Sequence, residues 1–132
     1  MKKSGVVEAL KKASAGLLFP SETDAPFEPF EWAGEPGKPD KARVLELAGL
    51  PPGTPVKTKG LDAFFKDATR EEAWHDDQEK AEVQRFRGLV QAIKENLADV
   101  KVFLVGGAEK DVFIVGRAGD GWAGLKTRVV QT

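Results

Sequence analysis

The residues best suited to chemistry in this chain are acidic side chains gathered between positions 17 and 32. That segment reads LLFPSETDAPFEPFEW and contains no basic residue. Its carboxylates are Glu22, Asp24, Glu28 and Glu31. Three prolines fix φ and disfavour a helix through the segment, so the sequence predicts a stiff acidic loop. A rigid anionic loop suits a basic or metal-bearing partner.

Other chemistries find less support. The acidic loop lacks the alternating ligands and central glycine of a calcium-binding EF-hand loop, so a solvated acidic face is the favoured interpretation. His75 is the only histidine, which excludes a histidine-based metal cluster. Asp76 and Asp77 follow it, and acids that complement a helix N-terminus are favoured over a catalytic His–Asp pair. The glycines match no phosphate-binding motif. An enzyme that uses acidic residues and a metal is the least supported hypothesis, and we expect no cofactor and no metal site of its own.

Two tryptophans and the chain end are further candidates for contact with a partner. Trp32 and Trp74 each lie beside acids; tryptophan is over-represented at interface hot spots, but the edge of a core suits it equally well. The last predicted strand runs almost to Thr132, which would hold the terminal carboxylate rigidly enough to approach a magnesium ion in another protein's active site. From the residues alone, a terminus that simply ends there is favoured.

Length and composition limit the class of protein. A chain of 132 residues corresponds to one domain, residues 1–132, and it contains no cysteine, which excludes disulfide scaffolds and zinc ribbons. A net charge of −1 provides no global basic field for nucleic acid. Charged residues interrupt the N-terminal apolar run, so we expect neither a signal peptide nor a membrane span. A cytoplasmic location is therefore expected.

Hydrophobic periodicity and capping residues predict the elements that position these candidates. Apolar spacing of three and four residues predicts helices at 4–16, 41–48, 61–68 and 76–97. Asp40 is the expected N-cap of the second helix, and capping boxes are expected for Thr69 with Glu72 and for Asp76 with Glu79. The apolar stripe of the last helix predicts that it anchors the core; its members are Val83, Phe86, Val90, Ile93 and Leu97.

Strands are predicted at 27–33, at 56–59 and in three closely spaced segments at 100–107, 111–119 and 122–130. Pro29 restricts the first strand to a sheet edge or a bulge. Short connections force the last three strands to be antiparallel, with Asp120-Gly121 suited to a hairpin turn. Two of these strands are apolar at consecutive positions, which predicts helices on both sides of the sheet and an α+β fold.

The chain resembles the nuclease A inhibitor family over nearly its whole length. The resemblance rests on LKKASAGLLFPSETDAPFEPFEW at 10–32, LDAFFKDATREEAWHDDQEKA at 61–81, FRGLVQAIKENL at 86–97, and DVFIVG with WAGLKTRVVQT at 111–132. It implies a three-layer α/β/α sandwich with a mainly antiparallel sheet, similar to the pathogenesis-related-protein sandwich fold.

The same resemblance implies inhibition of a magnesium-dependent, sugar-non-specific endonuclease that cuts DNA and RNA. The partner would be this nuclease, with no direct contact to nucleic acid or membrane, and the free protein is expected to be a monomer. The implied contacts are Glu22, Trp74 and Thr132, with Asp24 and Asp76 as additional candidates. Glu22 and Thr132 are expected to approach the partner's magnesium ion, whereas Glu28 and Glu31 are interpreted as solvated supports.

One position departs from the family's pattern. The family has an acid before the contact tryptophan, and this chain has Ala73 there. Glu72, Asp76 and Asp77 are the nearby acids that could compensate. The departure, with the modest net charge, keeps a second hypothesis open, in which the same fold binds a different protein partner.

Overall fold

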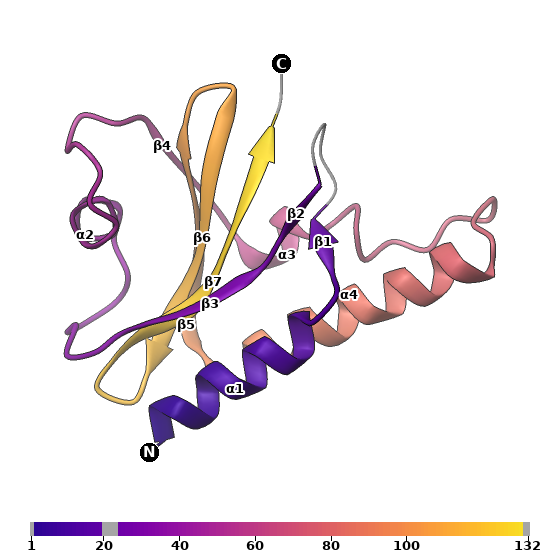
Figure 1. The fold of residues 1–132 in the computed structure, drawn as a ribbon, viewed down its shortest axis with the longest axis horizontal. Helices are drawn as coiled ribbons and strands as arrows, with labels where there is room; N and C mark the ends of the chain where they lie inside the picture. The colour runs from indigo at the N-terminus through magenta and orange to yellow at the C-terminus, as the bar shows by residue number, and fades with distance from the viewer. Residues whose placement is uncertain (1, 20–23, 131–132) are drawn as a thin grey trace.

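A computed structural model describes residues 2–19 and 24–130, and Figure 1 shows its arrangement. The elements are four helices and seven strands in the described residues. The helices are α1 (Lys2–Ser14), α2 (Lys41–Leu47), α3 (Leu61–Phe64) and α4 (Asp77–Asn96). The strands are β1 (Leu18–Phe19), β2 (Ala25–Pro26), β3 (Glu28–Trp32), β4 (Val56–Lys59), β5 (Ala98–Gly106), β6 (Glu109–Ala118) and β7 (Gly121–Val130).

Five strands form one antiparallel sheet in the order β3-β7-β6-β5-β4. Together with the helices this confirms an α+β fold. Both outer strands limit further pairing, β3 through Pro29 and β4 through Lys57 and Lys59, since proline lacks a donor and lysine charge opposes edge-to-edge association. The predicted edge position of β3 is therefore confirmed.

The turn between β6 and β7 differs from its prediction. Ala118 pairs with Gly121, so the two loop residues are Gly119 and Asp120 rather than Asp120 and Gly121. Gly119 has a φ of 61°, as expected for a two-residue hairpin with glycine at the first loop position. Gly121 belongs to β7, where an added Cβ would lie 2.6 Å from the Trp32 carbonyl oxygen, so this position needs glycine for closeness to β3.

Each face of the sheet carries its own hydrophobic cluster, as the apolar strands predicted. Leu10 of α1 and Phe86 of α4 pack with Ile114 on one face. Val44 of α2 packs with Phe113 on the other. Figure 1 shows α1 and α4 on one side of the sheet and α2 on the opposite side. The alternation of side chains along each strand separates the two clusters.

Three of the four predicted helices are confirmed with changes at their ends. The first lies at 2–14 rather than 4–16, and the Ser14 hydroxyl donates to the Leu10 carbonyl 2.8 Å away in its last turn. Asp40 caps α2 by accepting from the Arg43 amide at 2.9 Å. All five residues of the predicted stripe on α4, and also Leu89, are buried. No helix in the described parts of the chain has the length and apolarity needed to cross a membrane.

The segment before α4 contains the clearest error of sequence interpretation. The helix predicted at 61–68 ends at Phe64, after one turn. The predicted Thr69–Glu72 capping box is wrong, because the Thr69 hydroxyl donates to the Phe65 carbonyl at 2.8 Å. Residues 65–76 therefore form a long connection instead of further helix, which leaves room for the turn that carries Trp74.

Candidate functional site

The predicted acidic loop is partly a small two-stranded sheet. β1 and β2 are antiparallel, with Leu18 opposite Pro26 and Phe19 opposite Ala25. This pairing at both ends of the segment was not predicted from the sequence, which indicated only a stiff loop there. Glu22 falls outside the described residues. Asp24 is exposed immediately before β2.

An aromatic cluster packs between this two-stranded sheet and the helices α3 and α4. Phe19 stacks on Phe64 with ring centroids 4.5 Å apart, and Phe27 meets Phe86 at 6.4 Å. Phe65 lies against both Phe19 and Phe27. Aromatic pairs at these distances stabilise by about 0.5–1.5 kcal/mol beyond their buried area. The acidic segment is thus attached to α3 and α4 through packed rings.

The end of β7 lies beside the acidic segment. The Thr127 hydroxyl is 3.4 Å from the Ala25 carbonyl oxygen, to which it donates, although the two are 102 residues apart in sequence. In Figure 1, β1 ends, β2 begins and β7 ends on the same side of the molecule. Thr132, the predicted contact at the chain end, falls outside the described residues. Val130 is the last residue of β7.

Glu28 and Glu31, both interpreted as solvated supports, have different environments. Glu28 is exposed, as a solvated support should be. Glu31 is only half-exposed, and its Oε2 atom is buried without a hydrogen-bond partner in the described parts of the chain. The interpretation of Glu31 as solvated is therefore wrong, because one of its carboxylate oxygens is buried where β3 pairs with β7.

The two candidate tryptophans have different environments. Trp32 is half-buried, with its ring 4.4 Å from Phe30 and 6.1 Å from Phe113, so it covers an edge of the core. Trp74 is 73% exposed. Burying a tryptophan is strongly favourable, so one left in solvent is the more informative observation. Of the two, Trp74 is the candidate for contact with a partner.

Leu18 is a candidate that sequence reasoning missed. At 47% exposure it is, with Trp74, one of the two large hydrophobic side chains exposed in the described residues. Its neighbours Leu17 and Phe19 turn inward. The signal available in the sequence was the run of three apolar residues, because a strand must turn alternate side chains outward.

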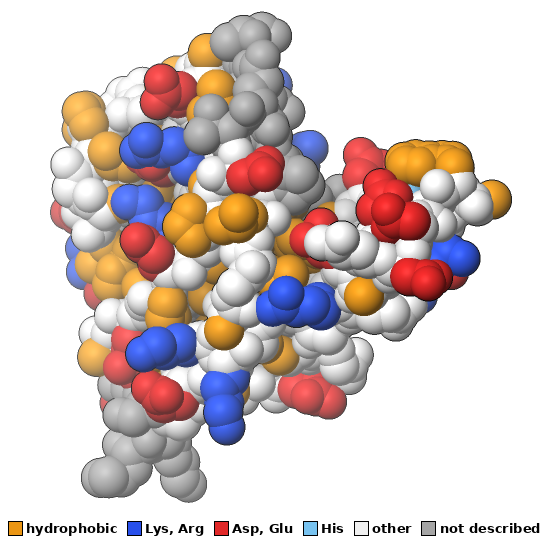
Figure 2. Space-filling model, turned by 45° about the vertical axis from the view of Figure 1, so that its right-hand side comes forward, with side chains coloured by type: hydrophobic (Ala, Val, Ile, Leu, Met, Phe, Trp, Pro, Cys, Tyr) orange, Lys and Arg blue, Asp and Glu red, His pale blue; other side chains and the backbone are white. Residues whose placement is uncertain are grey.

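A hollow connects Trp74 to the aromatic cluster. Trp74 and His75 line it together with Phe86, and acids surround them; the full lining is Asp67, Ala68, Trp74, His75, Glu79, Glu82, Val83 and Phe86. Figure 2 shows the surface hollowed between the body of the molecule and the projecting part around the start of α4, where acidic side chains gather. This surface is anionic with one large apolar side chain at its rim.

Asp76 has a structural task. Its Oδ1 atom accepts from the Glu79 amide at 2.8 Å, and Glu79 Oε1 accepts from the Asp76 amide at 3.0 Å. The predicted capping box is confirmed. The carboxylate that was a candidate contact is thus already engaged in starting α4.

Two variants separate the effect of Asp76 as the N-cap of α4 from the effect of its charge. Asp76→Ala is expected to lower the free energy of unfolding by about 1 kcal/mol, because it leaves the Glu79 amide without its acceptor. Asp76→Asn, which keeps that acceptor, is expected to stay within about 0.5 kcal/mol of the parent. Urea denaturation measures both. Equal stability of the two variants would contradict the capping role.

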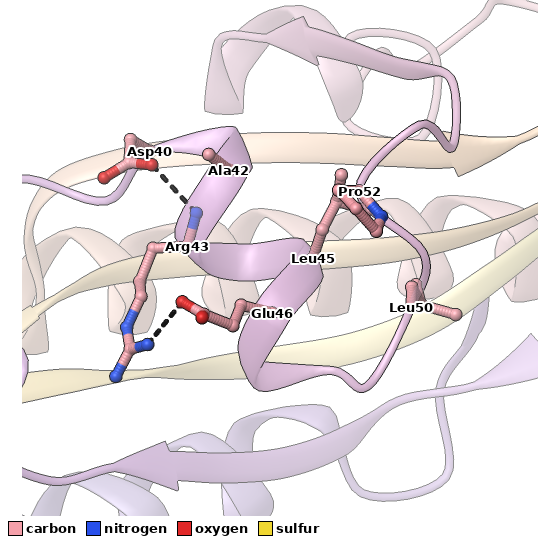
Figure 3. Close-up of a pocket in the computed structure, with 7 residues that line it drawn as sticks. All are labelled: Asp40, Ala42, Arg43, Leu45, Glu46, Leu50 and Pro52. Carbon is pink, nitrogen blue, oxygen red and sulfur yellow. Dashed lines mark hydrogen bonds and ion pairs between the residues drawn. The ribbon is translucent and has the colours of Figure 1, made fainter.

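A second hollow lies on the opposite face, along α2 (Figure 3). Arg43 and Glu46 both line it, and Arg43 Nη1 donates to Glu46 at 2.5 Å; Arg43 Nε also donates to Glu35, outside the lining, at 2.6 Å. The hydrogen bond from Arg43 lowers the pKa of Glu35, and both acids raise the pKa of Arg43. Because its arginine is bonded to two carboxylates, this hollow offers no unpaired cation to an anionic ligand.

Metal binding has no support in the described residues, where no group of three or more His, Asp or Glu side chains could hold an ion.

Residues 4–132 match the family model described as nuclease A inhibitor-like protein. No protein of curated function matches the chain significantly. Because the family match extends over nearly the whole chain, the protein belongs to the nuclease A inhibitor-like family, an inhibitor family whose name implies a nuclease as partner.

Proposed function

We propose that this protein inhibits a magnesium-dependent, sugar-non-specific endonuclease by covering its active site. The observation that carries the proposal is Trp74, 73% exposed beside a hollow lined by Asp67, Glu79 and Glu82. A nuclease site that holds phosphates and a metal ion is cationic. An anionic surface with an aromatic anchor complements it in charge and in hot-spot chemistry.

The acidic loop and the chain end are proposed to complete this surface. Glu22, with Asp24 as a helper, would present carboxylates where a scissile phosphate carries its oxygens. Thr132 would bring the terminal carboxylate to the partner's magnesium ion. The supporting observation is that β1, β2 and β7, which lead to these residues, meet on one side of the molecule (Figure 1). Asp76 is proposed to contribute charge at the rim in addition to its cap.

We infer the finer description of the fold from the same family relationship. The helices on both faces support a three-layer α/β/α sandwich formed by a single domain, similar to the pathogenesis-related-protein sandwich fold. We also propose that the protein acts as a cytoplasmic monomer that needs no cofactor and performs no catalysis.

The test compares inhibition by two variants with that by the parent protein. Glu22→Ala and deletion of Thr132 are each expected to raise the inhibition constant about tenfold or more, because the first removes a charge from the contact and the second withdraws the terminal carboxylate by one residue from the partner's magnesium ion. A plasmid-degradation assay with a magnesium-dependent endonuclease measures this. Neither change should lower the melting temperature.

Glu28→Ala is the matched control, because it removes the same charge from an exposed position on β3. Its inhibition constant is expected to stay within about twofold of the parent. Unchanged inhibition by both test variants would remove the proposed mechanism.

A different protein partner is the second candidate function. Ala73, exposed directly before Trp74, favours it because the family's contact pair has an acid there. Recovery of a defined non-nuclease partner that binds through Trp74, together with no inhibition of magnesium-dependent endonucleases, would support this function over the first.

A further inference from the structure

Trp74 occupies a defined turn although its side chain is exposed. The His75 amide donates to the Glu72 carbonyl oxygen at 3.1 Å, which closes a four-residue turn from Glu72 to His75 with Trp74 at its third position. A second bond joins the same two residues: the Glu72 amide donates to the His75 Nδ1 atom at 3.0 Å. Both hydrogen bonds join Glu72 to His75, the residues that flank Ala73 and Trp74.

The imidazole also contacts the tryptophan directly. The rings of Trp74 and His75 meet edge to face, with centroids 4.4 Å apart and an interplanar angle of 74°. The Glu72 end of the turn is fixed in addition by Arg70, whose Nε donates to the Glu72 carboxylate at 2.6 Å and whose guanidinium lies 3.1 Å from Asp67. His75 is thus the side chain that ties Trp74 to a rigid turn.

This arrangement requires the neutral imidazole. An Nδ1 atom accepts a hydrogen bond only through its free lone pair, and the imidazolium ion has none. Histidine ordinarily changes its charge between about pH 5 and 8. Protonation would therefore break the bond to the Glu72 amide and set two N–H groups against each other. The charged groups around the imidazole are Asp67, Arg70, Glu72, Asp76, Glu79 and Glu82.

We propose that His75 is a positioning residue whose neutral form presents Trp74 to the partner, and whose protonation releases the turn and weakens binding. The geometry of the turn stands on its own. The effect on binding rests on the proposed function, in which Trp74 is a contact.

The first experiment uses the free protein, so that it does not depend on any nuclease. In ¹⁵N-labelled protein titrated from pH 7.5 to 5, the Glu72 amide shift is expected to follow the His75 imidazole signals with the same midpoint. Hydrogen exchange of this amide, corrected for the intrinsic effect of pH, is expected to accelerate about tenfold on protonation. In His75→Ala the same loss of protection is expected already at pH 7.5.

His75→Asn is the matched control, because its side-chain oxygen can accept the same backbone hydrogen bond and does not titrate. Its Glu72 amide is expected to remain protected across the whole pH range. An amide in the parent protein that is indifferent to imidazole protonation, or that is equally protected in His75→Ala, would overturn the proposal.

The second experiment measures binding to a magnesium-dependent, sugar-non-specific endonuclease by calorimetry at pH 7.5 and 5.5. The parent is expected to lose about tenfold more affinity than His75→Asn over this interval, and the comparison cancels titration of the nuclease itself. Equal losses would overturn the link between protonation and binding. Absence of any binding at either pH would contradict the proposed function, while the turn would still be judged by the free-protein measurements.

Discussion

Replacing Trp74 by alanine is expected to weaken inhibition of the partner nuclease by about 30-fold or more, the effect of losing an interface hot spot of about 2 kcal/mol. The side chain is 73% exposed, so the free protein loses only a small buried fraction and the contact with the His75 ring. The free energy of unfolding is expected to change by less than about 0.5 kcal/mol. Inhibition constants and urea denaturation of the same samples separate the two effects.

Trp32→Phe is the matched control for this variant. Trp32 is half-buried against Phe30 and Phe113, so its replacement is expected to destabilise the protein and leave inhibition by the folded protein unchanged. Trp74→Ala is thus expected to weaken inhibition and keep stability, whereas Trp32→Phe is expected to lower stability and keep inhibition. An inhibition constant for Trp74→Ala within about twofold of the parent would contradict the assignment of Trp74 as a contact.

Gly124→Ala is expected to produce the largest loss of stability, about 3 kcal/mol or more. A Cβ at this position would lie 1.7 Å from the Ile114 carbonyl oxygen, a separation that no repacking of side chains relieves. Strands β6 and β7 would have to separate at the centre of the sheet. For a domain of this size, such a loss lowers the Tm by about 10 °C, which thermal denaturation followed by circular dichroism measures.

Gly107→Ala provides the comparison, because a Cβ there meets nothing within 4 Å. This variant is expected to keep the parent Tm within about 2 °C. Similar melting temperatures for the two variants would show that the closeness of β6 and β7 at Gly124 does not control stability.

Much of the fold was predictable because its signals are local. The stripe on α4 depends on a spacing of three and four residues, and its start depends on Asp76 and Glu79, three residues apart. The last strands follow from apolar runs joined by short turns. The end of α3 was not predictable in the same way, because Phe64 and Phe65 turn toward Phe19 and Phe27 from a distant segment.

The candidate site was predictable only as a set of residue types. The sequence identified Trp32 and Trp74 as equal candidates, and the packing of Trp32 against Phe113 separated them. It identified Asp76 as an acid, and the structure assigned its carboxylate to the cap of α4. Leu18 was missed because its exposure depends on which face of β1 turns toward the aromatic cluster.

The sequence by itself determined the element types, the acidic character of the 17–32 segment and the family resemblance that the family match then confirmed. These depend on residue identity and on spacings of a few positions. Only the tertiary structure decided that Trp74 is exposed and that Thr127 lies beside Ala25. The physical reason is that exposure and such contacts result from the packing of segments far apart in the chain, which no local pattern encodes.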